Sequence, residues 1–135
     1  MTGQARVVVI TGASAGVGRA VARKFADRGD KIALLARGDA GLDGAAGDVR
    51  AAGGEPLTVP VDMADQTGVE QAAERVERDL GPIDVWVNNA FAGELAPFTE
   101  MRPEGFTRII EVTYLGYVHG TRAALRRMQI GRAHV

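Results

Sequence analysis

The feature that most constrains this sequence is a glycine-rich segment joining a short apolar run to an amphipathic one. Residues 7–11 are typical of a buried strand, whereas residues 17–29 have the periodicity of a helix. Between them stands Gly12-Ala13-Ser14-Ala15-Gly16-Val17-Gly18, with the spacing G-x-x-x-G-x-G. Unbonded amides at the start of a helix attract anions, and glycines let the backbone approach a ligand closely. The segment therefore predicts a binding loop for a ligand that carries phosphate, such as a pyrophosphate.

The same alternation continues along the chain and predicts an α/β fold. Short apolar runs rich in β-branched residues predict strands at 7–11, 31–36, 57–61 and 83–87. Amphipathic stretches predict helices at 17–29, 39–52, 65–80 and from 103 toward 128, with a loop at 91–102. Strands this apolar are typical of a parallel sheet covered by helices on both faces. We therefore expect a doubly wound parallel sheet of about four strands, whose ligand lies at the carboxyl ends of the strands.

Composition excludes several classes of function. The chain has 16 basic and 17 acidic side chains, so it lacks the positive surface expected of a protein that binds nucleic acid or a membrane surface. It has no cysteine, which removes disulfides, thiolate metal sites and a cysteine nucleophile, and we predict no metal site. The longest apolar runs, 7–10 and 32–36, are far shorter than the roughly 20 residues of a membrane-spanning helix. We expect a cytoplasmic protein.

Three further motifs follow the glycine loop in an order typical of one family. Asp62 comes after the third predicted strand, and Asn88-Asn89-Ala90 comes after the fourth. The last helical stretch contains Glu111-Val112-Thr113-Tyr114-Leu115-Gly116, followed by Gly-Thr-Arg-Ala-Ala-Leu at 120–125. Over residues 6–128 the chain therefore resembles the short-chain dehydrogenase/reductase family. The resemblance implies a Rossmann-type sheet, here incomplete, in which residues 1–128 are the N-terminal, cofactor-binding part of a single domain.

The resemblance also implies that the chain binds a nicotinamide dinucleotide. In the family the glycine loop lies at the pyrophosphate, and the aspartate after the third strand contacts the adenine. The cofactor-binding residues implied here are Thr11, Gly12, Ser14, Ala15, Gly16, Val17, Gly18, Arg37, Asp62, Asn89 and Ala90. Two alternatives stay open. Asp62 could be a helix-initiating cap before Asp65, and the amides of Asn88 and Asn89 could tie strand ends together.

The end of the second predicted strand favours NADP over NAD. An acidic residue at this place binds the ribose 2′-hydroxyl of NAD, whereas an arginine accommodates the 2′-phosphate of NADP. Ala36 stands where NAD-preferring relatives carry aspartate, and Arg37 lies about 20 residues after Gly18, as expected for the ribose contact. The alternative is that Arg37 is a solvated loop cation, because Ala15 stands where a second basic residue is often found.

The catalytic residues of the family have no counterpart in these 135 residues. Relatives use a serine, a tyrosine and a lysine four residues after that tyrosine, but the only lysines here are Lys24 and Lys31, and the only serine is Ser14. We therefore expect the parent protein to be an NADP-preferring oxidoreductase that transfers hydride between the nicotinamide and the carbonyl or alcohol group of a small molecule. The present chain is then an inactive fragment of it. The alternatives are a non-catalytic NAD(P)-binding or regulatory module, and a purely structural α/β domain whose glycine loop binds nothing.

Two residues depart from the family pattern. Thr113 replaces an asparagine that helps to relay protons, and its hydroxyl is expected to bond back to the helix carbonyl one turn earlier. Phe91 replaces the last glycine of Asn-Asn-Ala-Gly, and it either narrows the substrate pocket or packs against its own loop.

Two expectations concern the chain as a whole. Residues 129–135, which include His134, resemble the translation of a common sequencing adapter, so we expect a non-native tail. Four strands without the rest of the family's sheet leave an open edge and an exposed apolar face, from which we expect poor solubility or oligomerisation. Relatives often form dimers or tetramers through helices that this chain partly contains.

Overall fold

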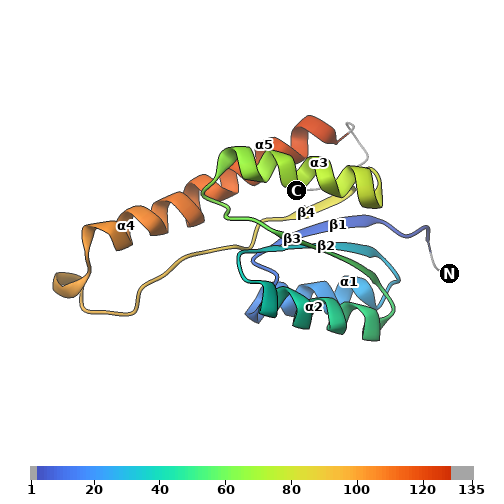
Figure 1. The fold of residues 1–135 in the computed structure, drawn as a ribbon, viewed down its shortest axis with the longest axis horizontal. Coiled ribbons are helices and arrows are strands. Elements are labelled where there is room, and N and C mark those ends of the chain that lie inside the picture. The colour runs from blue at the N-terminus through green and yellow to red at the C-terminus, as the bar shows by residue number, and fades with distance from the viewer. Residues whose placement is uncertain (1–2, 129–135) are drawn as a thin grey trace.

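The computed structural model describes residues 3–128 as one parallel sheet between two layers of helices (Figure 1). The strands are β1 (Val7–Thr11), β2 (Lys31–Ala36), β3 (Glu55–Pro60) and β4 (Val85–Val87), paired in the order β3-β2-β1-β4. The longer helices are α1 (Gly16–Ala26), α2 (Asp39–Ala52), α3 (Gln66–Leu80), α4 (Pro103–Ile109) and α5 (Gly116–Arg127). Within residues 3–128, none of the helices has the length and apolar character needed to cross a membrane. The predicted Rossmann-type α/β fold is confirmed.

Apolar side chains on both faces of the strands explain why helices cover both faces. Successive side chains of a strand point to opposite sides, so Val8 and Ile10 pack toward α1 and α2 while Val7 and Val9 pack toward α3 and α5. Figure 1 shows these two helix pairs on opposite sides of the sheet. Trp86 of β4 is also fully buried. This core fixes the strands so that their carboxyl ends lie together at one edge of the sheet.

Two strands have bounds that differ from the prediction. The third begins at Glu55 rather than residue 57, because its register against β2 pairs Glu55 with Lys31. The fourth contains only Val85–Val87, although the Asp84 amide already donates a hydrogen bond to the carbonyl of Val7 (2.9 Å). Both bounds depend on hydrogen bonds to the neighbouring strand, and the local sequence pattern does not indicate where those bonds begin.

Apart from shifts of one residue at the starts of α1 and α3, the helices differ from the prediction in two places. The first ends at Ala26, and Gly29 terminates the following turn with a φ of 79°. The stretch from 103 toward 128 is helical as predicted, but Ile110–Leu115 form a π-helical segment between α4 and α5. Such segments are rare and are frequently found at functional sites. The predicted loop at 91–102 contains one short 3₁₀ turn, Phe98–Glu100.

Candidate functional site

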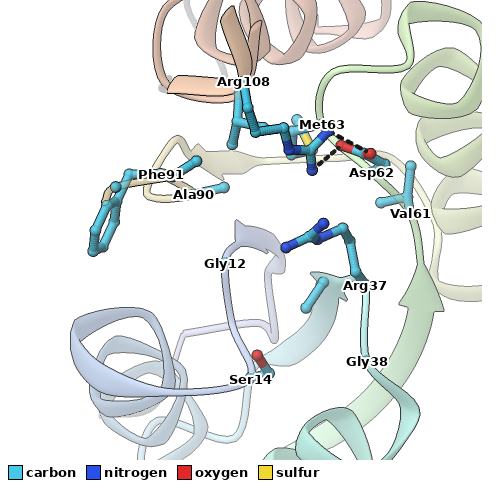
Figure 2. A pocket seen from close by; sticks show the side chains of 14 residues that line it. Gly12, Ser14, Arg37, Gly38, Val61, Asp62, Met63, Ala90, Phe91 and Arg108 are labelled. Carbon is cyan, nitrogen blue, oxygen red and sulfur yellow. Dashed lines mark hydrogen bonds and ion pairs between the residues drawn. The ribbon is translucent and has the colours of Figure 1, made fainter. Parts of the chain in front are cut away.

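A cavity of about 730 Å³ opens at the carboxyl ends of the strands (Figure 2). Every strand is followed by residues that line it: Gly12 and Ser14 after β1, Arg37 and Gly38 after β2, Asp62 and Met63 after β3, and Ala90 and Phe91 after β4. Arg108 and Val112, from the helical run that begins at Pro103, close the remaining side. Doubly wound sheets bind their ligands at this place. The volume also lies within the range of small-molecule sites, about 300–1,000 Å³.

At two of its glycines, Gly12 and Gly18, the loop approaches its neighbours too closely for a side chain. Gly12 has a φ of 65°, and a Cβ on it would lie 2.8 Å from the Cα of Ala90. A Cβ on Gly18 would collide with the carbonyl oxygen of Gly12. Gly16 also has a positive φ, 57°, but no other atom would lie within 4 Å of its Cβ. Gly12 and Gly18 therefore close the loop on itself, while Gly16 leaves open space at the start of α1.

At the start of α1, no acidic or capping side chain of the helix itself binds the free backbone amides. Its N-cap, Ala15, supplies no side-chain cap, and its first turn contains no acidic residue. By contrast, the start of α3 is capped by Asp65, whose carboxylate accepts a hydrogen bond from the Gly68 amide (3.1 Å). The first amides of a helix lack intrahelical partners and attract negative charge. Of these two helix starts, that of α1 is therefore the one that can accept an anionic ligand.

Two predicted site residues hold the loop in place. The Thr11 hydroxyl is buried and accepts hydrogen bonds from the backbone amides of Asn89 (2.9 Å) and Ala90 (3.0 Å). The Asn89 side chain donates to the carbonyls of Thr11 and Gly12, both at 3.2 Å. These contacts are those of the alternative interpretation, in which the amide of Asn89 ties strand ends together. Asn88 acts in the same manner, accepting from the Trp86 indole (2.9 Å) and donating to Thr121 (3.0 Å).

Arg37 extends into the cavity from the end of β2 (Figure 2). No hydrogen bond or ion pair joins it to the rest of residues 3–128, and its side chain is exposed. It precedes α2, whose N-cap, Gly38, supplies no side-chain cap. Ser14 lies against the same helix, because a Cβ on Gly41 would be 2.8 Å from the Cβ of Ser14. The cavity therefore contains a cation, a hydroxyl and a helix start next to one another.

Asp62 is held by Arg108, a residue that belongs to none of the motifs recognised in the sequence. Arg108 donates two hydrogen bonds to its carboxylate, Nη1 to Oδ2 at 2.8 Å and Nη2 to Oδ1 at 3.0 Å. These bonds hold the pKa of Asp62 below its ordinary value, with further help from the Ala64 amide. The N-cap of α3 is Asp65 rather than Asp62. The two partners are 46 positions apart, so no local spacing could have indicated the pair.

The two departures from the family pattern both lie next to the cavity. The hydroxyl of Thr113 was expected to bond to the helix carbonyl one turn earlier, but it bonds to Ala92 instead. It accepts from the Ala92 amide (3.0 Å) and donates to the Ala92 carbonyl (3.3 Å), because the π-helical segment places it against this loop. The ring of Phe91 lies at the side of the cavity away from Asp62 and is 75% exposed (Figure 2).

The predicted cofactor residues fall into three groups. Gly12, Ser14, Arg37, Asp62 and Ala90 line the cavity. The exposed start of α1 contains Ala15, Gly16 and Val17, and the buried supports are Thr11 and Gly18, joined by the half-buried Asn89. The cofactor roles of all of them stay predictions. The proposed tail, with His134, lies outside the described residues.

Known proteins of one family are similar to this sequence along nearly the whole chain. The profile of the short chain dehydrogenase family matches residues 6–134. An uncharacterized oxidoreductase, YxnA of Bacillus subtilis, is 32% identical over 121 residues, which cover 90% of this chain and 34% of that protein. The chain therefore spans about a third of the length of this relative.

Solved structures are similar in fold and sequence. The alcohol dehydrogenase of the archaeon Thermococcus sibiricus, complexed with 5-hydroxy-NADP, has a TM-score of 0.84 and 34% identity, over 92% of this chain and 53% of that one. An NAD⁺-bound xylitol dehydrogenase has a TM-score of 0.85 and 32% identity, over 91% and 48%. The chain spans about half of each, and the two structures contain different types of dinucleotide.

Proposed function

The chain belongs to the short-chain dehydrogenase family, and we propose that it is the dinucleotide-binding part of an oxidoreductase that prefers NADP to NAD. The family assignment supports an oxidoreductase that binds a nicotinamide dinucleotide. The finer proposal is carried by one observation, the Arg37 side chain directed into the cavity at the end of β2. Because similar structures contain either NADP or NAD⁺ ligands, the likeness alone does not choose between them.

The glycine loop fits a pyrophosphate. Gly12 and Gly18 allow the loop to fold tightly, and the open space at Gly16 lies where α1 presents its unbonded amides. These amides and the positive end of the helix would hold the two phosphates. The same loop borders the cavity through Gly12 and Ser14, so a dinucleotide bound there would extend along the ends of the strands.

The choice of NADP follows from charge at the end of β2. The guanidinium of Arg37 is suited to the 2′-phosphate of NADP. The start of α2 at Gly38 has no side-chain cap, but its first turn already contains the acidic Asp39, so Arg37 is the group at this place that favours a phosphate. The hydroxyl of Ser14 adds a neighbouring donor. Ala36 offers no carboxylate for the ribose 2′-hydroxyl of NAD.

We further propose that these 135 residues do not turn over substrate by themselves. When bound, the dinucleotide would supply a hydride to the carbonyl carbon of a small-molecule substrate, or accept one from its alcohol carbon. The acid or base that the family uses is a tyrosine followed four residues later by lysine, and this sequence contains no such pair. The alternative to an oxidoreductase fragment is a regulatory module that binds NAD(P) without catalysis. A fragment and a regulatory module are both expected to bind the dinucleotide.

The test is calorimetric titration of the 135-residue chain with NADPH and with NADH. Wild type is expected to bind NADPH more tightly, and Arg37→Asp is expected to lose about tenfold or more in NADPH affinity with a smaller change for NADH. Arg50→Asp is the matched control, because it changes the net charge equally at the other end of α2. Absence of binding by wild type rejects the dinucleotide proposal. Equal losses for the two dinucleotides in Arg37→Asp reject the role of Arg37.

A further inference from the structure

Arg108 of α4 fixes the orientation of one carboxylate in the cavity. Its two hydrogen bonds to Asp62, at 2.8 and 3.0 Å, run in parallel from the guanidinium to the two carboxylate oxygens (Figure 2). Such a bidentate pair fixes the plane of the carboxylate as well as its position. Asp62 follows β3 and Arg108 lies on α4, so the pair also joins two sides of the cavity.

The pair leaves few acceptor sites on Asp62 for a ligand. A carboxylate has about four lone-pair sites. Oδ1 already accepts from the Ala64 amide (3.0 Å) and from Arg108, and Oδ2 accepts from Arg108. One site therefore remains, on Oδ2. The Asp62 side chain is 36% exposed and lines the cavity, so this site is open to a donor on a bound ligand.

Arg108 also makes the negative charge of Asp62 compatible with a phosphate-bearing ligand. Arg37, across the cavity, is close enough to lower the pKa of Asp62 as well, after the larger effect of Arg108. Asp62 alone would repel phosphates near Arg37, whereas the ion pair with Arg108 is neutral and leaves the charge of Arg37 uncompensated. The lowered pKa of Asp62 keeps its carboxylate ionised, and therefore an acceptor, in mildly acidic solution as well as at neutral pH.

We propose that Arg108 is a positioning residue that makes Asp62 select a nucleobase presenting an amino group, as adenine does, over one presenting a carbonyl at the same place. The inference rests on the proposed dinucleotide function. An amino group donates to the remaining site on Oδ2, whereas a carbonyl oxygen would face another acceptor and leave both unpaired. Without Arg108 the carboxylate could turn, so its acceptor would no longer be aimed at one edge of the base.

The experiment compares NADPH with its hypoxanthine counterpart, in which a carbonyl replaces the adenine amino group. Dissociation constants of both are measured by calorimetry for wild type, Arg108→Met, Arg108→Lys and Arg102→Met. The ratio of the two constants within one preparation does not depend on the fraction of folded protein. Arg102, the N-cap of α4, does not line the cavity and provides the control. We expect a ratio of about tenfold in wild type and in Arg102→Met, close to one in Arg108→Met, and intermediate in Arg108→Lys.

The outcomes separate this inference from the proposed function. A wild-type ratio near one, or an unchanged tenfold ratio in Arg108→Met, overturns the role of Arg108 while NADPH binding itself stands. If Arg108→Met binds neither dinucleotide, Arg108→Lys decides: a reduced ratio supports the inference and an unchanged ratio overturns it. Absence of NADPH binding by wild type overturns the proposed function and, with it, the role of Arg108.

Discussion

Among single residues, Thr11 shows how a buried hydroxyl organises the cavity from behind. It accepts hydrogen bonds from the amides of Asn89 and Ala90 and donates to the carbonyl of Val87 at 3.4 Å. Thr11 begins the glycine loop, and the resemblance to the family implies that it binds the cofactor. In the structure its side chain supports the connection after β4, and through this connection it supports Ala90, which lines the cavity.

Replacing this hydroxyl is expected to destabilise the fold. Thr11→Val keeps the shape of the side chain but leaves two amides without their acceptor, which we expect to cost about 1–3 kcal/mol in the free energy of unfolding. Thr11→Ser keeps the hydroxyl and should lose less. Urea denaturation followed by circular dichroism measures both. Equal losses in the two variants would show that the methyl group, rather than the hydroxyl, is responsible.

The lowered pKa of Asp62 predicts how the free energy of unfolding depends on pH. Its pKa in the folded chain lies below the ordinary value of about 3.9, chiefly because Arg108 donates hydrogen bonds to the carboxylate. A lowered pKa contributes stability that is present above the unfolded value and is lost as the pH falls through the folded value. Asp62→Asn removes this contribution. We therefore expect the free energy of unfolding of Asp62→Asn to fall less steeply than that of wild type as the pH is lowered below about 4.

Urea denaturation at a series of pH values measures this difference. The other carboxylates of the chain titrate in both proteins, so they cancel when the two slopes are compared. Parallel pH profiles for wild type and Asp62→Asn would contradict the assignment of the lowered pKa to the Asp62 and Arg108 pair.

At the scale of elements, α5 packs against the side chains of β4 and of the residue that follows it. The contact is made at Gly120, where a Cβ would collide with Oδ1 of Asn88 and lie 2.8 Å from Nε1 of Trp86. Those two atoms are themselves hydrogen bonded at 2.9 Å, and Asn88 also donates to Thr121 of α5. A glycine on the helix therefore makes room for a polar network that joins helix and strand.

Filling this space is expected to separate the two elements. Gly120→Ala would displace α5 or break the network, at a cost of about 1–3 kcal/mol in the free energy of unfolding. Gly47→Ala is the matched control, since Gly47 lies within α2 and a Cβ there would meet nothing within 4 Å. That variant should gain about 0.5–1 kcal/mol from helix propensity. Comparable losses in the two variants, measured by urea denaturation, would contradict the close contact at Gly120.

At the scale of the whole molecule, one helical run exposes a row of apolar side chains. Ile110, Tyr114, Val118 and Leu125 follow at intervals of a helical face, and Tyr114 and Leu125 are 67% and 61% exposed. In addition, β4 is an outer strand of the described sheet, and it has no proline of the kind that β3 has at Pro56 and Pro60. Exposed apolar patches and free strand edges both favour association.

We therefore expect the 135-residue chain to self-associate at micromolar concentration. The double variant Tyr114→Glu with Leu125→Glu should lower the sedimentation coefficient toward that of a monomer, because it places charge in the row. Arg50→Glu, on the other side of the sheet, should leave association unchanged. A monodisperse wild-type monomer in sedimentation velocity would contradict this expectation.

The sequence by itself determined the parts of this protein that depend on neighbours along the chain. Alternating apolar runs predicted the parallel sheet, and the glycine spacing predicted the loop at its edge. Helix α2 has the predicted bounds, because hydrophobic periodicity and terminal glycines are local signals. The place of Arg37 at the end of the second strand also follows from local spacing, whereas its cofactor role stays a prediction.

Only the tertiary structure decided which of these residues meet. The pairing of Arg108 with Asp62 and the contact of Thr113 with Ala92 both join segments far apart in the sequence. The same holds for the bounds of β3 and β4, which are set by hydrogen bonds to the neighbouring strand. A local pattern records which face of an element is apolar, but it does not record the partner that each polar group finds once the faces are packed.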